Sequence, residues 1–186
     1  ALPGRTHGQH AVPATYGLKV AVWIDEFARH VERLEQCGPR VFQTMLGGAA
    51  GTAASFGAQG LEVQARLAAH LDMPPMPVPA RTIMDHLAEH IMALALLAAS
   101  CGKFANEIYT GMKQEFGEVE EPISAGTVGS STMPQKRNPF TSQDIMAYAA
   151  QIRTMVPLAL EAVMTEHEAN RQTSLMMRQA QNQVCV

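Results

Sequence analysis

The stretch that decides the fold of this 186-residue chain is Gly126-Thr127-Val128-Gly129-Ser130-Ser131-Thr132-Met133-Pro134-Gln135-Lys136-Arg137-Asn138-Pro139. Its two glycines are free to adopt positive φ and its two prolines lack a backbone donor, which indicates a loop. Long helical patterns flank this loop on both sides. The loop carries two adjacent hydroxyls, an ammonium, a guanidinium and an amide. Such a density of hydrogen-bond donors suits an anionic substrate.

The side chains of this loop suggest two tasks, binding an anion and moving a proton. Lys136 or Arg137 can pair with a carboxylate, and Asn138 can orient it. Backbone N–H groups near Gly129 can form an anion-binding nest, and a serine hydroxyl held there can act on a proton. A plain polar surface loop is the alternative interpretation of a segment rich in Gly, Ser and Pro.

Eleven consecutive residues favour the functional interpretation. Gly-Ser-Ser-Thr-Met-Pro-Gln-Lys-Arg-Asn-Pro resembles the signature loop of the fumarase/aspartase superfamily, whose members form or release fumarate by β-elimination or catalyse a related cycloisomerisation. The resemblance implies a mobile loop over about residues 122–141, with Ser130 as the catalytic base. It also implies that Lys136 and Asn138 bind a substrate carboxylate and that Ser131 contacts the substrate.

The composition agrees with a globular enzyme and excludes other classes of protein. Apolar residues make up 47% of the chain, enough for one domain with a core, and the net charge is −3 without a Lys/Arg cluster for nucleic acid. The three cysteines are an odd number without a Cys-x-x-Cys pair, which indicates free thiols in a reducing, cytoplasmic setting. The apolar stretch Ile91–Ser100 is too short to span a bilayer, so no membrane contact is expected.

The N-terminal segment is expected to be a loop that leads into a helix. Pro13 suits the first turn of this helix, and apolar residues then recur every three to five positions as far as Gln36. The helix should stop or kink at Gly38-Pro39, where proline disrupts the helical hydrogen bonds.

A histidine lies in the same N-terminal loop, within Thr6-His7-Gly8-Gln9. A histidine just before a helix is usually a surface or capping residue. Thr-His-Gly-Gln, however, resembles the second conserved region of the adenylosuccinate lyase branch of the superfamily. This resemblance implies that His7 is the general acid that protonates the leaving nitrogen and that Thr6 contacts a substrate carboxylate or hydroxyl. His10 is expected to be an ordinary polar residue of the loop.

The rest of the chain is expected to be helical apart from its connectors. A short amphipathic helix fits Gly60–Leu71, and the proline-rich Met73–Pro79 should be an extended connector. The longest helical pattern covers about residues 82–116, roughly 50 Å at 1.5 Å per residue. Another covers Ile145–Val163, in which Pro157 should produce a kink.

The long apolar and alanine-rich helices predict an all-α fold, a bundle of long helices in which these surfaces are buried. Because helices this long and this rich in alanine and methionine cannot bury themselves within one protomer, the alanine-rich stripe is expected to lie in an intersubunit helical core. The resemblance implies that residues 1–186 are the central helical domain of a longer protein that has further domains upstream and downstream. It also implies a homotetramer in which each active site draws residues from three subunits.

Two further histidine motifs need interpretation. His86-Leu87-Ala88-Glu89-His90 fits the His-x-x-Glu-His pattern of some zinc proteases, but a third ligand is missing from the sequence pattern, and we expect a structural or substrate-facing pair. Thr165–Arg171 resembles the His-Glu-Arg stretch of adenylosuccinate lyases and cycloisomerases. It has Ala169 where arginine is usual, so Arg171 is the candidate substrate contact. No metal or organic cofactor is expected.

The resemblance leaves two branches of the superfamily open. Thr6-His7-Gly8-Gln9 favours a carbon–nitrogen lyase of the adenylosuccinate type. Gln9-His10-Ala11, Leu46–Thr52 and Gly117-Glu118-Val119 look at least as much like 3-carboxy-cis,cis-muconate cycloisomerase. The expected function is therefore fumarate release from an N-succinyl substrate, with lactonisation as the alternative. A non-catalytic helical scaffold is the rival from a different class.

Overall fold

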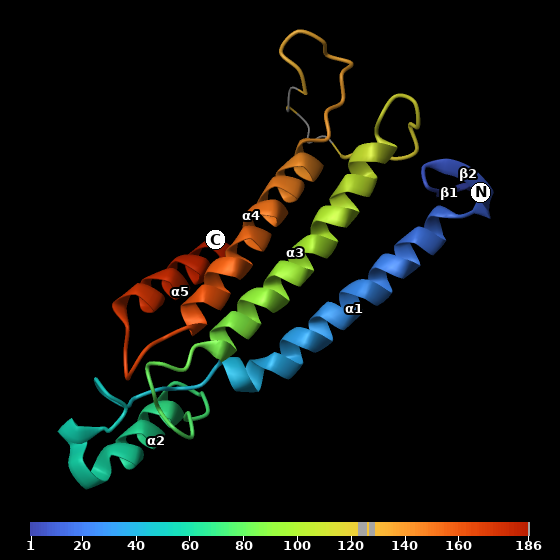
Figure 1. The fold of residues 1–186 in the computed structure, drawn as a ribbon. Coiled ribbons are helices and arrows are strands. Elements are labelled where there is room, and N and C mark those ends of the chain that lie inside the picture. The colour runs from blue at the N-terminus through green and yellow to red at the C-terminus, as the bar shows by residue number, and fades with distance from the viewer. Residues whose placement is uncertain (123–125, 127–128, 186) are drawn as a thin grey trace.

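The computed structural model describes residues 1–122, 126 and 129–185; the parts of the expected signature loop at 123–125 and 127–128 lie outside the described residues. Three long helices lie side by side as an elongated bundle (Figure 1). They are α1 (Tyr16–Val41), α3 (Asp85–Gly111) and α4 (Phe140–Val163). Sheet structure in the described residues is confined to one short hairpin and an isolated bridge, and the predicted all-α fold is confirmed.

Smaller elements lie at the two ends of this bundle (Figure 1). At one end, which we call the loop end, lie the hairpin of β1 (Leu2–Thr6) and β2 (Gln9–Ala14), the turn after α3 and the described part of the signature loop. At the opposite end lie the 3₁₀ helix Ala54–Gln59 and α2 (Gly60–His70). The last helix, α5 (Arg171–Val184), begins near this opposite end and packs along α4 and α3.

The prediction of an N-terminal loop is wrong, because residues 2–14 form an antiparallel hairpin. Its two-residue turn is His7-Gly8, with φ of +53° and +76°. Positive φ at both central residues is the geometry that closes a two-residue hairpin with the twist of the strands. Pro13 pairs with Pro3 inside the hairpin and does not start the helix. Thr15 instead caps α1, and its hydroxyl accepts the Leu18 N–H at 3.1 Å.

The predicted stop at Gly38-Pro39 is close to the observed end of α1, which continues to Val41. Pro39 lies in the last turn of the helix, which ends two residues later, so the disruption by proline comes at the helix end. The Phe42 N–H still reaches the Gly38 carbonyl at 2.8 Å.

The expected helix over residues 82–116 is confirmed with shorter bounds, Asp85–Gly111. Its most buried seam consists of alanines and one isoleucine, while its leucines are less buried. The buried apolar positions, at spacings of three, four and seven residues, are Ala88, Ile91, Ala95, Ala98 and Ala105. Small side chains let two helix axes approach closely, and the larger side chains then flank the contact.

The partner of this seam is α4, the element against which α3 packs most extensively. Ala149, Ala159 and Ala162 of α4 are buried. At Gly102 an added methyl group would come within 3.2 Å of the Ala149 Cβ. The sequence placed the alanine-rich stripe in an intersubunit core, but its most buried alanines pack against α4 within one chain.

The remaining predictions of local structure are mostly confirmed. The helix predicted over Gly60–Leu71 is α2, and Met73–Pro79 is a non-helical connector that pairs with Thr44 through one isolated bridge. The helix α4 continues through Pro157 to Val163. By length and composition alone α3 could cross a membrane, a test that core helices of soluble proteins also pass, and here α3 packs against α1, α4 and α5.

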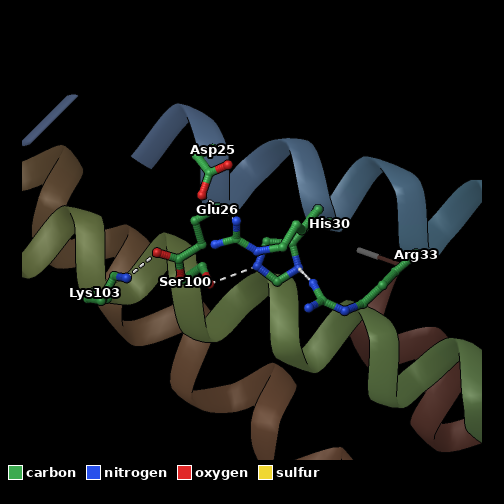
Figure 2. Close-up of polar contacts among 7 residues, drawn as sticks. Asp25, Glu26, His30, Arg33, Ser100 and Lys103 are labelled. Atoms are coloured by element: carbon green, nitrogen blue, oxygen red, sulfur yellow. Dashed lines mark hydrogen bonds and ion pairs between the residues drawn. The ribbon is translucent and has the colours of Figure 1, made fainter. Parts of the chain in front are cut away.

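A buried polar relay joins α1 to α3 (Figure 2). His30 and Ser100 are buried, and the His30 Nε2 lies 2.8 Å from the Ser100 Oγ. The Ser100 hydroxyl donates to Glu26 at 2.5 Å, and Lys103 holds the other oxygen of Glu26. Arg33 lies 3.3 Å from the His30 Nδ1.

The directions of these bonds determine the tautomer of His30. Ser100 has a single proton and gives it to Glu26, so its oxygen must accept the Nε2–H of His30. The Nδ1 of His30 then carries a lone pair and accepts from Arg33. Burial, followed by the charge of Arg33, lowers the pKa of His30 below 6.5, and Arg29 and Lys103 act in the same direction while Glu26 opposes them.

We expect the free energy of unfolding to decrease as pH falls from about 7 to 5. In this window the unfolded chain protonates His30 near its ordinary pKa of 6.5 while the folded chain keeps it neutral. Urea unfolding at both pH values should show a smaller decrease for His30→Gln. Ser100→Ala should lose about 1–3 kcal/mol because it leaves buried polar atoms unpaired. An identical pH dependence in the native chain and His30→Gln would contradict this role for His30.

Candidate active site

A carboxylate closes the base of the signature loop. Glu121 accepts the Thr141 N–H at 3.1 Å, the Ser142 N–H at 2.8 Å and the Ser142 hydroxyl at 2.5 Å. Burial alone would raise the pKa of Glu121, but these hydrogen bonds lower it overall. The residue before the loop is therefore held as an anion at the N-terminus of α4, where the helix dipole also favours negative charge.

Ser130 lies in a compact turn of the loop. Its hydroxyl oxygen accepts the Met133 N–H at 3.2 Å and, more weakly, the Thr132 N–H at 3.5 Å. Donors aimed at a hydroxyl oxygen stabilise its deprotonated form, which lowers the free energy needed to use the oxygen as a base. The amide of Asn138 closes the same turn by donating to the Gly129 carbonyl at 2.7 Å.

A large cavity lies between this loop and the turn after α3. It measures about 810 Å³, and its lining includes Lys113, Lys136, Arg137, Glu118 and Glu120. Arg137 pairs with Glu120 at 3.2 Å. In the described part of the chain, the Lys113 and Lys136 ammonium groups have no carboxylate within ion-pair distance. The cavity therefore has positive charge available for an anionic ligand.

The predicted acid lies at the same end of the bundle (Figure 1). His7 is exposed in the turn of the hairpin, and Thr6 is the last residue of β1. Neither residue lines the 810 Å³ cavity. A neighbouring cavity of about 260 Å³, lined by Gly8, Glu118 and others, lies between the hairpin and α3.

Arg171 lies far from the loop. It is the first residue of α5, beyond the end of α4, whose 24 residues span about 36 Å. There it lines a cavity of about 530 Å³ together with Arg81, Asn170, Ser174 and Arg178. The structure therefore brings Ser130, Lys136 and Asn138 together in one loop, but it does not bring Arg171 to them within one chain.

The His-x-x-Glu-His pair lines a third region, a cavity of about 540 Å³. Burial lowers the pKa of His86 and of His90, and the ring of His90 stacks edge-on against Phe42 at 5.5 Å between ring centres. Glu89 pairs with Arg40 instead of facing a metal. Among the described residues, no group of three His, Cys, Asp or Glu side chains is close enough to hold a metal ion.

Sequence reasoning missed three residues of this site. No local sequence motif marks Glu121 or Lys113, because their roles depend on segments that only the folded bundle brings together. Glu118 lies within a stretch that resembles the cycloisomerase branch, and this was the available signal.

Comparison with known proteins gives a consistent set of matches. A protein-family model described as Lyase matches residues 1–154. The chain is 42% identical to an N-acetyl-S-(2-succino)cysteine lyase of Enterococcus italicus, over 89% of this chain and 36% of that protein. It is 42% identical to an adenylosuccinate lyase of Methanothermobacter thermautotrophicus, over 98% of this chain and 41% of that protein. A 3-carboxy-cis,cis-muconate lactonizing enzyme from Pseudomonas putida has a TM-score of 0.90 and 34% identity, over 99% of this chain and 40% of that one. The chain thus spans about two fifths of the length of these relatives.

Proposed function

The chain belongs to the lyase family of the fumarase/aspartase superfamily, and from this premise we propose that it releases fumarate from an N-succinyl substrate of the adenylosuccinate type by β-elimination. The observation that carries the proposal is the Ser130 oxygen, which accepts backbone N–H groups in a loop whose Lys136 lines a basic cavity. Residues 1–186 would be the central helical domain of this enzyme.

In this mechanism Ser130 removes a proton from the carbon next to a substrate carboxylate. Such a proton is weakly acidic, because its removal leaves a carbanion. The negative charge spreads onto the carboxylate, so cations and N–H donors at that position lower the barrier. Lys136 is suited to this task because it lines the cavity and has no carboxylate partner within the described residues. Asn138 and Ser131 would orient the same carboxylate.

His7 would supply the second proton. When the bond between carbon and nitrogen breaks, the nitrogen takes the electron pair and must be protonated to be a good leaving group. A general acid is therefore required on the side opposite the base. His7 is exposed at the tip of the hairpin and is free to reach a ligand, and Thr6 beside it would contact the substrate. The choice of a nitrogen leaving group rests on this histidine.

Lactonisation is the second candidate, favoured by the TM-score of 0.90 to the Pseudomonas putida enzyme. In that reaction a carboxylate adds to a double bond, the reverse of the bond-breaking step. In lactonisation the carbon next to the new bond gains a proton, so Ser130 would donate the proton that it removes in elimination, and the same carboxylate ligands would serve both reactions.

The positions of the proposed site residues at opposite ends of the helix bundle support an assembly of several copies. Ser130 and Lys136 lie at the loop end, and Arg171 lies in a cavity with Arg81 and Arg178 at the opposite end. Antiparallel packing of copies would bring the two ends together. α1 provides two sides for such packing, because Leu18 and Val22 on one side and Ile24 and Val31 on another are more than half exposed. We therefore propose a cytoplasmic homotetramer with shared active sites.

The complete protein should release fumarate from adenylosuccinate, and an absorbance assay would measure it. The same preparation should be given N-acetyl-S-(2-succino)cysteine and 3-carboxy-cis,cis-muconate, and kcat/KM compared. The largest kcat/KM for adenylosuccinate would support the proposal. A larger value for carboxymuconate would support the cycloisomerase instead, and no turnover of any of the three would favour the helical scaffold.

A further inference from the structure

An ion pair of two hydrogen bonds ties the N-terminal hairpin to the turn after α3. The Arg5 Nη1 donates to the Glu118 Oε2 at 3.1 Å, and the Arg5 Nη2 donates to the Glu118 Oε1 at 2.6 Å. The two side chains come from positions 113 residues apart and are 19% and 20% exposed. Two parallel hydrogen bonds between a guanidinium and a carboxylate fix both the orientation of the two side chains and the distance between them. A single contact between exposed charges does not.

Surrounding contacts hold both partners of this ion pair in place. The Arg5 guanidinium lies over the Phe116 ring, 4.8 Å from its centre. The Glu118 N–H donates to the Gly111 carbonyl at 2.9 Å, and Gly117 before it has a φ of +58°, a conformation that favours glycine. Glu118 is thus fixed to the last turn of α3.

The chemistry of the pair keeps it charged. The hydrogen bond from Arg5 lowers the pKa of Glu118, and the hydrogen bond to Glu118 raises the pKa of Arg5. A second ion pair lies nearby: Lys19 and Glu107 line the same 260 Å³ cavity as Arg5 and Glu118. These two ion pairs therefore join the hairpin to the turn after α3 and join α1 to α3.

The position of Arg5 in the hairpin gives the ion pair its significance. Arg5 immediately precedes Thr6 and lies two residues before His7 on a strand whose register is set by Arg5 opposite His10. Because the turn has only two residues, the tip of the hairpin cannot move far without its strands. Glu118, on the other side, lines the 810 Å³ cavity.

We propose that Arg5 and Glu118 are positioning residues, whose ion pair fixes the hairpin carrying Thr6 and His7 against the wall of the 810 Å³ cavity. The pair thereby fixes where the tip of the hairpin, which carries the acid His7, lies at the loop end of the bundle. The significance for catalysis rests on the proposed function, whereas the fixing of the hairpin does not. Misplacement of a catalytic group by about 1 Å can reduce turnover by roughly 100-fold, so the effect of a loosened hairpin is measurable.

The first experiment measures amide hydrogen exchange of residues 2–14 and needs no activity. Arg5→Gln and Glu118→Gln should each speed exchange in the hairpin by about tenfold, and the double variant should be no faster than either single one. Arg40→Gln is the matched control, because it breaks the exposed Arg40–Glu89 ion pair near the opposite end of the bundle and should leave hairpin exchange unchanged. Unchanged exchange in both single variants would overturn the proposal.

The second experiment measures turnover in the complete protein. Arg5→Gln and Glu118→Gln should lower kcat roughly tenfold with little change in KM. In a plot of kcat against pH, the decrease on the high-pH side, which reports deprotonation of the general acid, should change. Arg5→Lys keeps the charge without the two parallel hydrogen bonds and should recover part of kcat. A normal kcat and pH profile in a variant with a loosened hairpin would overturn the positioning role. A native protein without turnover would instead refute the proposed function, and the exchange measurement would still test the ion pair.

Discussion

Replacing Ser130 with alanine should lower kcat by about 10²–10⁴-fold and leave substrate binding nearly intact. The hydroxyl oxygen of Ser130 accepts N–H groups of Met133 and Thr132, which stabilise it as the negatively charged base. The variant loses this base but keeps Lys136 and Asn138, the groups proposed to bind the carboxylate. The loss should therefore appear in kcat and not in KM.

The neighbouring hydroxyl provides the matched control for this substitution. Ser131→Ala removes a hydroxyl of the same loop, and because Ser131 is only a proposed substrate contact, its kcat should decrease far less. Exchange of the substrate's carbon-bound hydrogen with solvent separates the proton-transfer step from later steps. This exchange should be lost in Ser130→Ala. Exchange at the native rate in that variant would show that another group is the base.

The helices could be predicted from the sequence because their apolar residues recur every three to four positions. The innermost seam of α3 could not, since alanines and leucines lie on overlapping stripes of the same helix. Which residues face the partner depends on how closely α4 approaches, and Gly102 against Ala149 is what permits the close approach. That information is shared between two segments and is absent from either one alone.

The hairpin escaped prediction because its turn lacks the usual chemistry. Hairpins of this type favour Asn-Gly or Asp-Gly, whereas this turn is His7-Gly8. The strands also contain Pro3 and Pro13, which normally argue against a strand. Because the two strands form an isolated ribbon, each strand has one edge without a partner strand. The backbone nitrogen of a proline can face this free edge without losing a ladder bond.

The candidate site was predictable to the extent that it is local. Ser130, Lys136 and Asn138 are neighbours in sequence, so one motif contained all three. The ion pair of Arg5 with Glu118 and the cap that Glu121 places on α4 join residues far apart, and a single sequence has no signal for such pairs. The structure also separates Arg171 from the loop, which the sequence pattern alone did not indicate.

This separation leads to a prediction about mixed assemblies. If Ser130 and Arg171 serve one active site, they must come from different copies, because the length of α4, about 36 Å, lies between their ends of the bundle. Ser130→Ala and Arg171→Ala proteins should then each be nearly inactive. Every site in a pure assembly lacks one of the two groups.

Mixing the two inactive proteins should restore activity. After unfolding and refolding together in equal amounts, a site receives its Ser130 from one copy and its Arg171 from another, each native with a chance of one half. About a quarter of the sites should therefore be complete, and activity should rise to about a quarter of the native value. A mixture of Ser130→Ala with Lys136→Ala is the control, because both residues belong to one loop and no site can recover both. If the first mixture also stays inactive although native mass spectrometry shows tetramers that contain both variants, Ser130 and Arg171 do not serve one site from different copies.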